Sequence, residues 1–91
     1  MIILDNQGNE IRSGIAYKFI FGHPGPDVTT VVVDEVREDG TVSAYDVLFK
    51  MRIESIKADQ LWRPIKHKWD SYPQDRDAVI AYAGSSALSL E

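Results

Sequence analysis

Apolar and polar residues alternate in two segments of the chain, and both segments are predicted to be strands. In residues 15–21, every second position is taken by Ile15, Tyr17, Phe19 or Phe21. In residues 45–54, apolar side chains again alternate with charged ones, and Leu48 is the exception. A period of two places alternate side chains on opposite faces of a half-buried strand. The second segment is longer than most strands, so we expect it to bend and to serve two sheets.

A β-hairpin is predicted around Asp39-Gly40. The β-branched residues 31–38 precede this dipeptide, and residues 41–49 follow it. Asp-Gly is typical of a type I′ turn, in which both central residues need a positive φ. A two-residue loop sets Glu38 opposite Thr41, Val36 opposite Ser43, Val32 opposite Val47 and Val31 opposite Leu48. This register also sets Asp34 opposite Tyr45 on an apolar side, a mismatch that a bulge would relieve.

Shorter elements are expected on both sides of this hairpin. Residues 2–11 contain a turn-like polar stretch between apolar residues, which predicts a short ribbon at an edge, and residues 22–27 form a Gly- and Pro-rich loop. Residues 58–61 suit one 3₁₀ turn, and residues 62–65 suit a short closing strand with Pro64 at an edge. Together these elements predict a mostly β fold, a small SH3-like antiparallel barrel of about five strands with a C-terminal helix.

The C-terminal helix is predicted over residues 72–83. Ser71 and Gln74 have the spacing of a capping box, and Gly84 is placed to end the helix. One face of such a helix would carry Tyr72, Val79, Ile80 and Ala83. Residues 85–91 are expected to be frayed.

The length of the chain leaves room for one small hydrophobic core. Its 91 residues divide into a barrel over residues 1–69 and a helical extension with a frayed end over residues 70–91. The absence of cysteine excludes disulfides, thiolate metal sites and cysteine nucleophiles. A net charge of −4 argues against a surface that is basic overall, although it leaves a local basic patch open.

The sequence also resembles a known group of proteins. Many small phage and bacterial proteins open with an Asp-x-x-Gly-Asn-x-Ile-x-x-Gly-Asp-x-Val-x-Tyr pattern, which this chain resembles in Asp5-Asn6-Gln7-Gly8-Asn9-Glu10-Ile11-Arg12-Ser13-Gly14 followed by Ile15-Ala16-Tyr17. The stretch from Ile56 to Trp62 is similar to the element that closes their SH3-like or KOW-like barrels. The resemblance covers about residues 5–65 and departs at Ile15, where the family usually has Asp. It implies a binding module in nucleic-acid or protein assemblies and transfers no catalytic residue.

One segment interleaves cations with aromatic residues. Residues 62–69 contain the two tryptophans of the chain and three cations, namely Trp62, Arg63, Lys66, Lys68 and Trp69. Such a segment could stack on nucleic-acid bases or clamp a proline-rich peptide. The alternative is that the indoles pack on the barrel while the cations reach into solvent, with one tryptophan inside and one outside as a compromise.

A second candidate surface is the barrel rim beside the loop of residues 22–27. Loops on rigid scaffolds often carry binding residues, so we expect His23 and Asp27 to act there together with Tyr17 and Tyr45. The alternative is that this loop is only a turn.

A third candidate surface is acidic. Five carboxylates surround the hairpin, namely Asp34, Glu35, Glu38, Asp39 and Asp46. They could mimic nucleic-acid phosphates or bind a basic partner. The alternative is a solvated ribbon whose charges prevent edge-to-edge pairing.

Catalytic and metal sites are not expected, and neither is a cofactor. His23 and His67 lie far apart, and neither has a second ligand at metal-binding spacing. No Gly-x-Ser-x-Gly motif presents a serine nucleophile. Asp34 and Glu35 are adjacent in a predicted strand, so their side chains point to opposite faces and cannot share one substrate.

The sequence therefore predicts a non-enzymatic module that binds a protein or nucleic-acid partner through the barrel rim and the adjoining basic-aromatic segment. The alternative is an acidic inhibitor or mimic of phage origin that blocks a nucleic-acid-binding partner. A third hypothesis is a structural homo-oligomer, in which the C-terminal helix buries Val79 and Ile80 against a second copy, so the chain is expected to be a monomer or a weak homo-oligomer through that helix. Because the chain has neither a signal-like start nor an apolar run near the ~20 residues that cross a bilayer, we expect a cytoplasmic location and no membrane contact.

Overall fold

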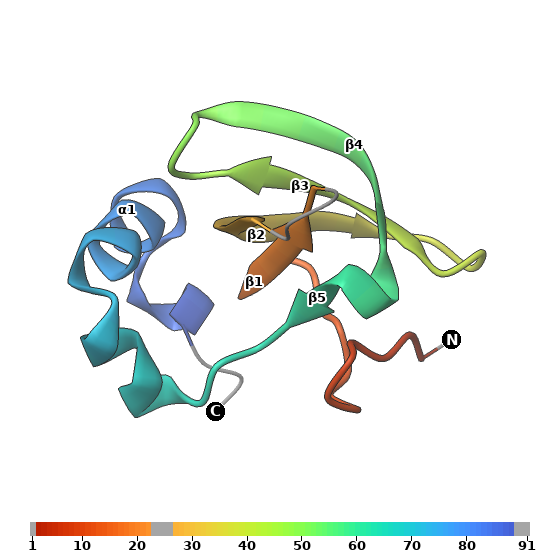
Figure 1. Ribbon diagram of the computed structural model, residues 1–91, viewed down its shortest axis with the longest axis horizontal. Helices are drawn as coiled ribbons and strands as arrows, with labels where there is room; N and C mark the ends of the chain where they lie inside the picture. Colours follow the sequence, from red (N-terminus) through yellow and green to blue (C-terminus); the bar gives the residue numbers. More distant parts are fainter. Residues whose placement is uncertain (1, 23–26, 89–91) are drawn as a thin grey trace.

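The chain forms one five-stranded antiparallel sheet with a short helical tail beside it (Figure 1). The computed structural model describes residues 2–22 and 27–88, with the backbone alone for residues 66 and 67. The elements follow one another as β1 (Ala16–Phe21), β2 (Asp27–Val36), β3 (Thr41–Asp46), β4 (Met51–Lys57), η1 (Ala58–Gln60), β5 (Leu61–Trp62), η2 (Lys66–Ser71), α1 (Pro73–Ala83) and η3 (Ser85–Leu88). The strands lie in the order β4-β3-β2-β1-β5.

A mostly β fold with one C-terminal α-helix is confirmed, whereas closure of the sheet into a barrel is not. β4 and β5 lie at opposite ends of the strand order, and no strand pairing joins them within the described residues. β4 arches over its neighbours (Figure 1). The fold is therefore an open and bent antiparallel sheet.

The β2–β3 hairpin is confirmed, but its loop and register differ from the prediction. Arg37 N–H donates to the Thr41 carbonyl at 2.9 Å and Gly40 N–H donates to the Arg37 carbonyl at 3.1 Å, which makes a three-residue loop. Gly40 has a φ of +86°, as such a loop requires after a type I turn. A bulge at Asp34 takes this carboxylate out of the apolar pairing, as the sequence suggested. The register is Val36–Val42, Glu35–Ser43, Val33–Ala44, Val32–Tyr45 and Val31–Asp46.

The single long strand predicted over residues 45–54 is wrong, because this segment is a second hairpin. β3 ends at Asp46, residues 47–50 form a turn, and β4 starts at Met51. Asp46 and Met51 pair directly, so the chain reverses within four residues.

The turn is made by the side chain of Asp46. Its Oδ1 accepts the N–H groups of Leu48 and Phe49, both at 2.9 Å, and this bonding favours a turn over an extended chain. Lys50 completes the reversal with a φ of +57°, the one positive φ of a non-glycine residue among those described. Val47 and Phe49 nevertheless continue the apolar alternation through the turn, so the pattern resembles one uninterrupted strand.

The elements on either side largely follow the sequence. The N-terminal ribbon forms, with a bridge between Leu4 and Glu10, and the 3₁₀ turn η1 lies where it was expected. The closing strand was predicted over residues 62–65 but is β5, which pairs with β1. Pro64 lies beyond this strand, because proline has no N–H to donate to a neighbour.

The predicted helix is present as α1, although it is not capped as expected. Tyr72 holds the N-cap position and makes no side-chain capping bond, so the capping box of Ser71 and Gln74 is wrong. Pro73 starts the helix instead, since its fixed φ suits the first helical position. Gly84 ends the helix with a φ of +87°, as predicted.

The buried face of the tail also differs from the prediction. Val79 is buried, but Ile80 remains 39% exposed and Ala83 is exposed, so the expected shared apolar face is wrong. Residues 85–88, expected to be frayed, form η3 and bury Ala87 and Leu88.

Two hydrophobic cores lie on opposite faces of the sheet. The strand core joins the N-terminal ribbon to all five strands through Ile11, Tyr17, Phe19, Val31, Val33, Val42, Ala44, Ile56 and Leu61. The tail core joins the other face to the helical tail through Ala16, Val32, Val47, Trp69, Val79, Ala87 and Leu88. Neighbouring strand residues alternate between the two cores, as the period of a strand requires.

Candidate functional site

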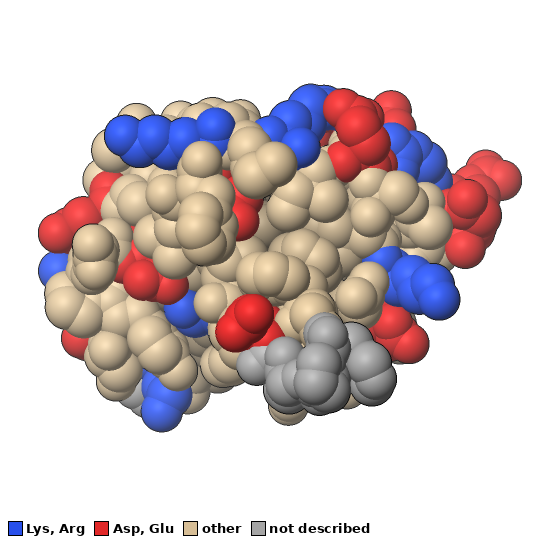
Figure 2. All heavy atoms as spheres, turned by 45° about the horizontal axis from the view of Figure 1, so that its top comes forward, with Lys and Arg blue, Asp and Glu red and all other residues tan. Residues whose placement is uncertain are grey.

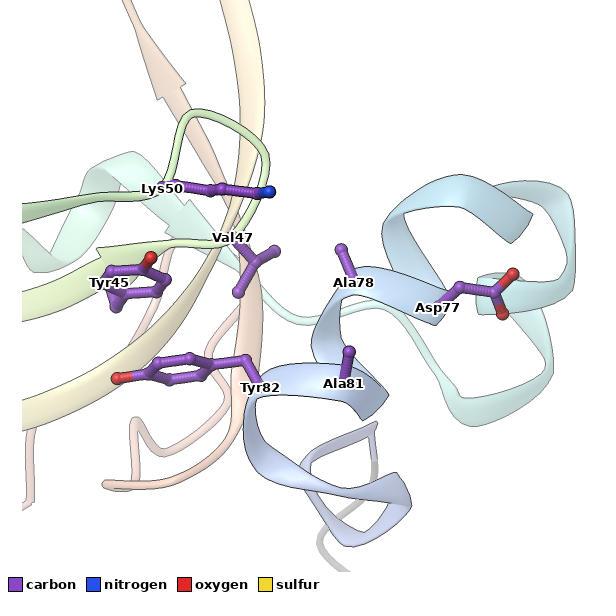
Figure 3. A pocket seen from close by; sticks show the side chains of 7 residues that line it. All are labelled: Tyr45, Val47, Lys50, Asp77, Ala78, Ala81 and Tyr82. Carbon is purple, nitrogen blue, oxygen red and sulfur yellow. The ribbon is translucent and has the colours of Figure 1, made fainter.

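A groove lies between the β3–β4 turn and α1. Its volume is about 470 Å³, and it is lined by Tyr45, Val47, Lys50, Asp77, Ala78, Ala81 and Tyr82. Figure 3 shows that the first three come from the sheet side and the last four from the helix. The two alanines leave space on the helix side, because their short side chains do not fill it.

An aromatic pair forms one wall of the groove. The rings of Tyr45 and Tyr82 stack with centroids 4.3 Å apart and planes inclined by 9°. One ring comes from the sheet and the other from the helix, so their contact also joins the two elements (Figure 3). Tyr82 remains 53% exposed. Tyrosines in such a setting can contact both apolar and polar groups of a ligand.

Two charged residues lie on opposite sides of the groove. Lys50 extends its side chain over the opening, whereas Asp77 directs its carboxylate away from it (Figure 3). None of the ion pairs among the described residues involves Lys50. Asp77 lies 3.4 Å from the guanidinium of its neighbour Arg76. The groove therefore presents one cation, Lys50, at its opening.

The groove exists because a buried ion pair holds α1 against the sheet. Lys18 Nζ in β1 lies 2.5 Å from Asp75 Oδ2 in the first turn of α1, with side chains 5% and 18% exposed. Thr30 in β2 donates its hydroxyl to the same carboxylate oxygen at 2.6 Å. Hydrogen bonds that involve charged groups are strong where water is excluded, so this triad fixes the start of the helix.

Aromatic rings of the tail surround the same ammonium group. Lys18 Nζ lies 4.0 Å from the ring centroid of Tyr72 and 5.6 Å from that of Trp69. These are cation–π distances, and the rings exclude water from the ion pair. The Trp69 side chain is fully buried, and its Nε1 has no hydrogen-bond partner among the residues that the structure describes.

The turn beside the groove exposes large apolar side chains. Leu48 is 36% exposed, Phe49 66% and Met51 56%. Leu48 and Phe49 lie in the chain between Val47 and Lys50, the two residues of this turn that line the groove. Exposed apolar side chains gathered next to a groove are typical of interaction surfaces.

Two of the predicted binding residues are core residues instead. Tyr17 is fully buried in the strand core, where its hydroxyl donates to the Glu10 carbonyl at 3.0 Å and accepts the Arg12 N–H at 3.0 Å. Trp69 is fully buried in the tail core. Neither ring is accessible to a partner, so both assignments to a binding surface are wrong. The expected compromise of one tryptophan inside and one outside is met for Trp69 alone, because Trp62 is half-buried.

The other predicted residues are dispersed. Asp27 is exposed at the start of β2, Lys68 is exposed in η2, and Arg63 is half-buried with its backbone N–H bonded to Asp5 Oδ2 at 3.0 Å. Tyr45 alone lines the groove, and Trp62 lies on β5, with β1 and β2 between it and β3. His23 and the side chain of Lys66 lie outside the described part of the chain.

Two of the five carboxylates around the first hairpin are paired with arginines, and a third is buried. Asp34 lies 2.5 Å from the guanidinium of Arg52, and Glu35 lies 3.0 Å from that of Arg37. Asp46 is 3% exposed, so it does not belong to this surface. In Figure 2, Lys and Arg side chains lie along the upper left of the visible face, and at the upper right Asp and Glu side chains lie next to Lys and Arg.

Among the described residues, three groups have a shifted pKa, and none of the three lies in the groove. Burial raises the pKa of Tyr17 above its ordinary value, against the opposing effect of its bond with the Arg12 N–H. Hydrogen bonds from the Thr41 hydroxyl and N–H lower the pKa of Asp39. Hydrogen bonds to Asp34 and Glu54 raise the pKa of Arg52. These shifts report local structure and do not indicate acid–base chemistry.

Sequence reasoning missed most of the groove. Ala78, Ala81 and Tyr82 have the spacing of one helix face, which is a signal that was available. The prediction chose the face of Val79 and Ile80 because their side chains are larger. The importance of Lys18 had no local signal, since its partner Asp75 is 57 residues away.

Comparisons with protein-family models, curated proteins and solved structures found no match to this chain. The described residues include no group of three or more His, Asp or Glu side chains that could hold a metal ion. None of the described helices is long and apolar enough to cross a membrane.

Proposed function

We propose that this chain is a non-enzymatic binding module that docks a protein partner in the groove between the β3–β4 turn and α1. The observation that carries this proposal is an open groove with a Tyr45–Tyr82 wall, beside which Phe49 and Met51 are left exposed. Large aromatic and apolar side chains around a groove supply most of the binding energy in protein interfaces.

A protein partner is favoured over a nucleic acid. Binding to phosphates needs several convergent cations, and the groove has Lys50 alone. In the basic-aromatic segment Trp69 is buried and cannot stack on bases. The net charge of −4 adds repulsion.

We also propose that the fold is of the SH3-like type. We propose further that the protein is cytoplasmic and belongs to the phage or bacterial group that the sequence resembles. The antiparallel strands β1 to β4, the 3₁₀ turn before β5 and the pairing of β5 with β1 support the SH3-like part. The alternative of an acidic mimic has less support, because Asp34 and Glu35 are paired with arginines and Asp46 is buried.

Site-specific photocrosslinking tests the docking surface. A benzophenone amino acid replaces Phe49, and the variant is expressed in cells of the native host and irradiated. A matched variant carries the same group at Glu38, an exposed residue of the β2–β3 loop. We expect protein adducts from position 49 that are absent from position 38 and are unchanged by nuclease.

Each contrary result has a defined meaning. Adducts at neither position, or equal adducts at both, would contradict the proposal. Adducts at position 38 alone would favour the acidic mimic. Adducts that nuclease removes would favour a nucleic-acid partner.

A further inference from the structure

We infer that the partner of this groove binds through a short segment in which a carboxylate lies beside an apolar side chain. The carboxylate pairs with Lys50 at the opening, and the apolar side chain fills the space between the sheet and α1. The inference rests on the proposed function of the groove and names the chemistry of the partner.

Lys50 determines the charge that a partner must complement. It is the one cation among the lining residues, and its side chain extends over the opening (Figure 3). Asp77, the one acidic lining residue, directs its carboxylate away from the opening and lies 3.4 Å from the guanidinium of Arg76. The charge at the opening is therefore positive, and an anionic group of the partner complements it.

The backbone of Lys50 is a second, independent observation. Its φ of +57° lies in the left-handed region, which costs free energy for a residue with a Cβ and costs less for Asn, Asp or Gly. The turn does not need a lysine there, because Asp46 makes the reversal by accepting the N–H groups of Leu48 and Phe49. Backbone strain of this kind is concentrated at sites where a side chain is used.

The use of the Lys50 side chain is not found within the fold. None of the ion pairs among the described residues involves its ammonium group. A strained lysine that pairs with no carboxylate in that part of the chain is explained if its ammonium group pairs with a carboxylate of a partner.

The uncharged lining residues determine what accompanies the carboxylate. They are aromatic or apolar, namely Tyr45, Val47, Ala78, Ala81 and Tyr82, and they surround a space of about 470 Å³. Pockets of about 300–1,000 Å³ with mostly apolar walls are typical of ligand sites. An apolar side chain of the partner therefore fits between the sheet and the helix. Its presence also shields the adjoining ion pair from water, which strengthens the pair.

The anion is expected to be a single carboxylate. Recognition of phosphate groups in peptides uses clusters of arginines, whereas this groove has one lysine. A run of acidic residues would be repelled by the net charge of −4 that the chain carries. The partner segment therefore has one Asp or Glu close to an aromatic or aliphatic residue.

Selection from a displayed library of random peptides tests the inference. The library is selected on the full wild-type chain, and the recovered peptides are sequenced. We expect them to combine one Asp or Glu with a nearby Leu, Phe, Tyr or Trp and to lack acidic runs. On Lys50→Asp, whose new side chain tolerates positive φ, the same library should yield Lys or Arg in place of the acidic residue.

Isothermal titration with the most frequent peptide measures the contribution of Lys50. Lys50→Asn is expected to weaken binding about three- to fivefold, as for a partly exposed ion pair, and Lys50→Arg to retain it within about twofold. Because Asn adopts positive φ more readily, Lys50→Asn should also raise the melting temperature by about 2–4 °C. Weaker binding in a more stable chain cannot be attributed to unfolding.

The space in the groove is tested from the helix side. Ala81→Phe fills the groove from an exposed position of α1 and is expected to weaken binding at least about tenfold. Ala83→Phe adds the same ring at an exposed alanine that does not line the groove, and Lys68→Asn removes an exposed cation of η2. Both control variants are expected to leave the affinity unchanged.

The contrary results separate this inference from the proposed function. Peptides that Ala81→Phe excludes but that show no preference for Asp or Glu would overturn the inference. An equal loss of affinity in Lys50→Asn and Lys68→Asn would overturn it as well. In both cases the groove still binds a protein segment, and the proposed function stands. If no peptide is recovered, or if Ala81→Phe and Ala83→Phe act alike, the proposed function fails together with the inference.

Discussion

The two faces of the sheet hold their cores together in different ways. On one face the strand core joins side chains from the five strands and the N-terminal ribbon, and its buried hydroxyl on Tyr17 bonds to backbone groups within seven residues. On the other face the tail core has fewer buried members and adjoins the ion pair of Lys18 with Asp75, 57 residues apart in the chain. One core depends on neighbouring strands, whereas the other depends on a distant charged contact.

This difference predicts two levels of stability in one small protein. Apolar contacts between hydrogen-bonded strands form together with the sheet. The packing of the tail depends on the contact of Lys18 with Asp75, so we expect the tail to open while the sheet stays folded. One wall of the groove belongs to the sheet and the other to the tail. The groove is therefore lost when the less stable of these two parts opens.

The largest expected loss of stability comes from truncating one large buried side chain in each core. Trp69→Ala in the tail core is expected to cost about 3–5 kcal/mol, and Leu61→Ala in the strand core about 2–5 kcal/mol. Amide hydrogen exchange distinguishes them. Trp69→Ala should accelerate exchange in α1 and η3 while β2 stays protected, and Leu61→Ala should accelerate exchange throughout. Equal acceleration everywhere in both variants would mean that the two cores open as one unit.

Breaking the ion pair should loosen the tail to a smaller extent. Lys18→Met leaves the Asp75 carboxylate without its cation, and the expected loss is about 2–3 kcal/mol, below the ~3–5 kcal/mol of a fully buried pair, because Asp75 is 18% exposed. Adding Asp75→Leu to Lys18→Met should restore at least half of the loss. Urea unfolding of the parent chain, of Lys18→Met, of Asp75→Leu and of the double variant measures the coupling energy between the two residues. If the losses of the two single variants simply add in the double variant, the ion pair is contradicted.

On the opposite face of the sheet, the burial of Tyr17 predicts that the stability of the folded chain falls at alkaline pH. Burial raises the pKa of this phenol in the folded chain, so above about pH 10 the unfolded chain loses the proton first. Stability is therefore fully present below pH ~10 and declines as the pH rises through the raised pKa. Tyr17→Phe should lose about 1–2 kcal/mol at neutral pH, because Glu10 and Arg12 lose a partner.

Urea midpoints between pH 8 and 11 test this prediction. The decline should be shallower in Tyr17→Phe than in the parent chain. Identical slopes would show that the phenol is not protected from ionisation.

The smallest expected effect lies at the tip of the first hairpin. Gly40 has a φ of +86°, and an added Cβ would meet no atom within 4 Å. Gly40→Ala should therefore cost only the backbone strain of about 1–2 kcal/mol, and Gly40→Asn less. Thermal unfolding measures both variants. A larger loss, or a loss of exchange protection in α1, would mean that the loop is coupled to the tail.

Local patterns predicted most of the strand core. The alternation from residue 15 to 21 gave β1, and Asp39-Gly40 located the first hairpin, because both signals act over a few residues. The second hairpin was missed since the turn residues kept the apolar alternation. Leu48, the one exception in that pattern, marked the turn that Asp46 forms with its side chain.

The groove could not be predicted in the same way. Tyr45 was chosen for its amphipathic ring, but its partner Tyr82 depends on how α1 is rotated against the sheet. That rotation is set by Asp75 and by Trp69, whose contacts reach back to Lys18. No pattern within a short window of sequence contains this information.

Asp5 joins the start of the chain to its last third. Asp5 is buried, with 6% of the residue exposed, and its carboxylate accepts the N–H groups of Gln7 and Asn9 through one oxygen and that of Arg63 through the other. The first ten residues thereby fix the direction in which the backbone leaves β5. In a shortened chain that begins after residue 10, the Arg63 N–H would lose its bond to Asp5. The tail would then lose its alignment with the sheet, although none of its own residues is altered.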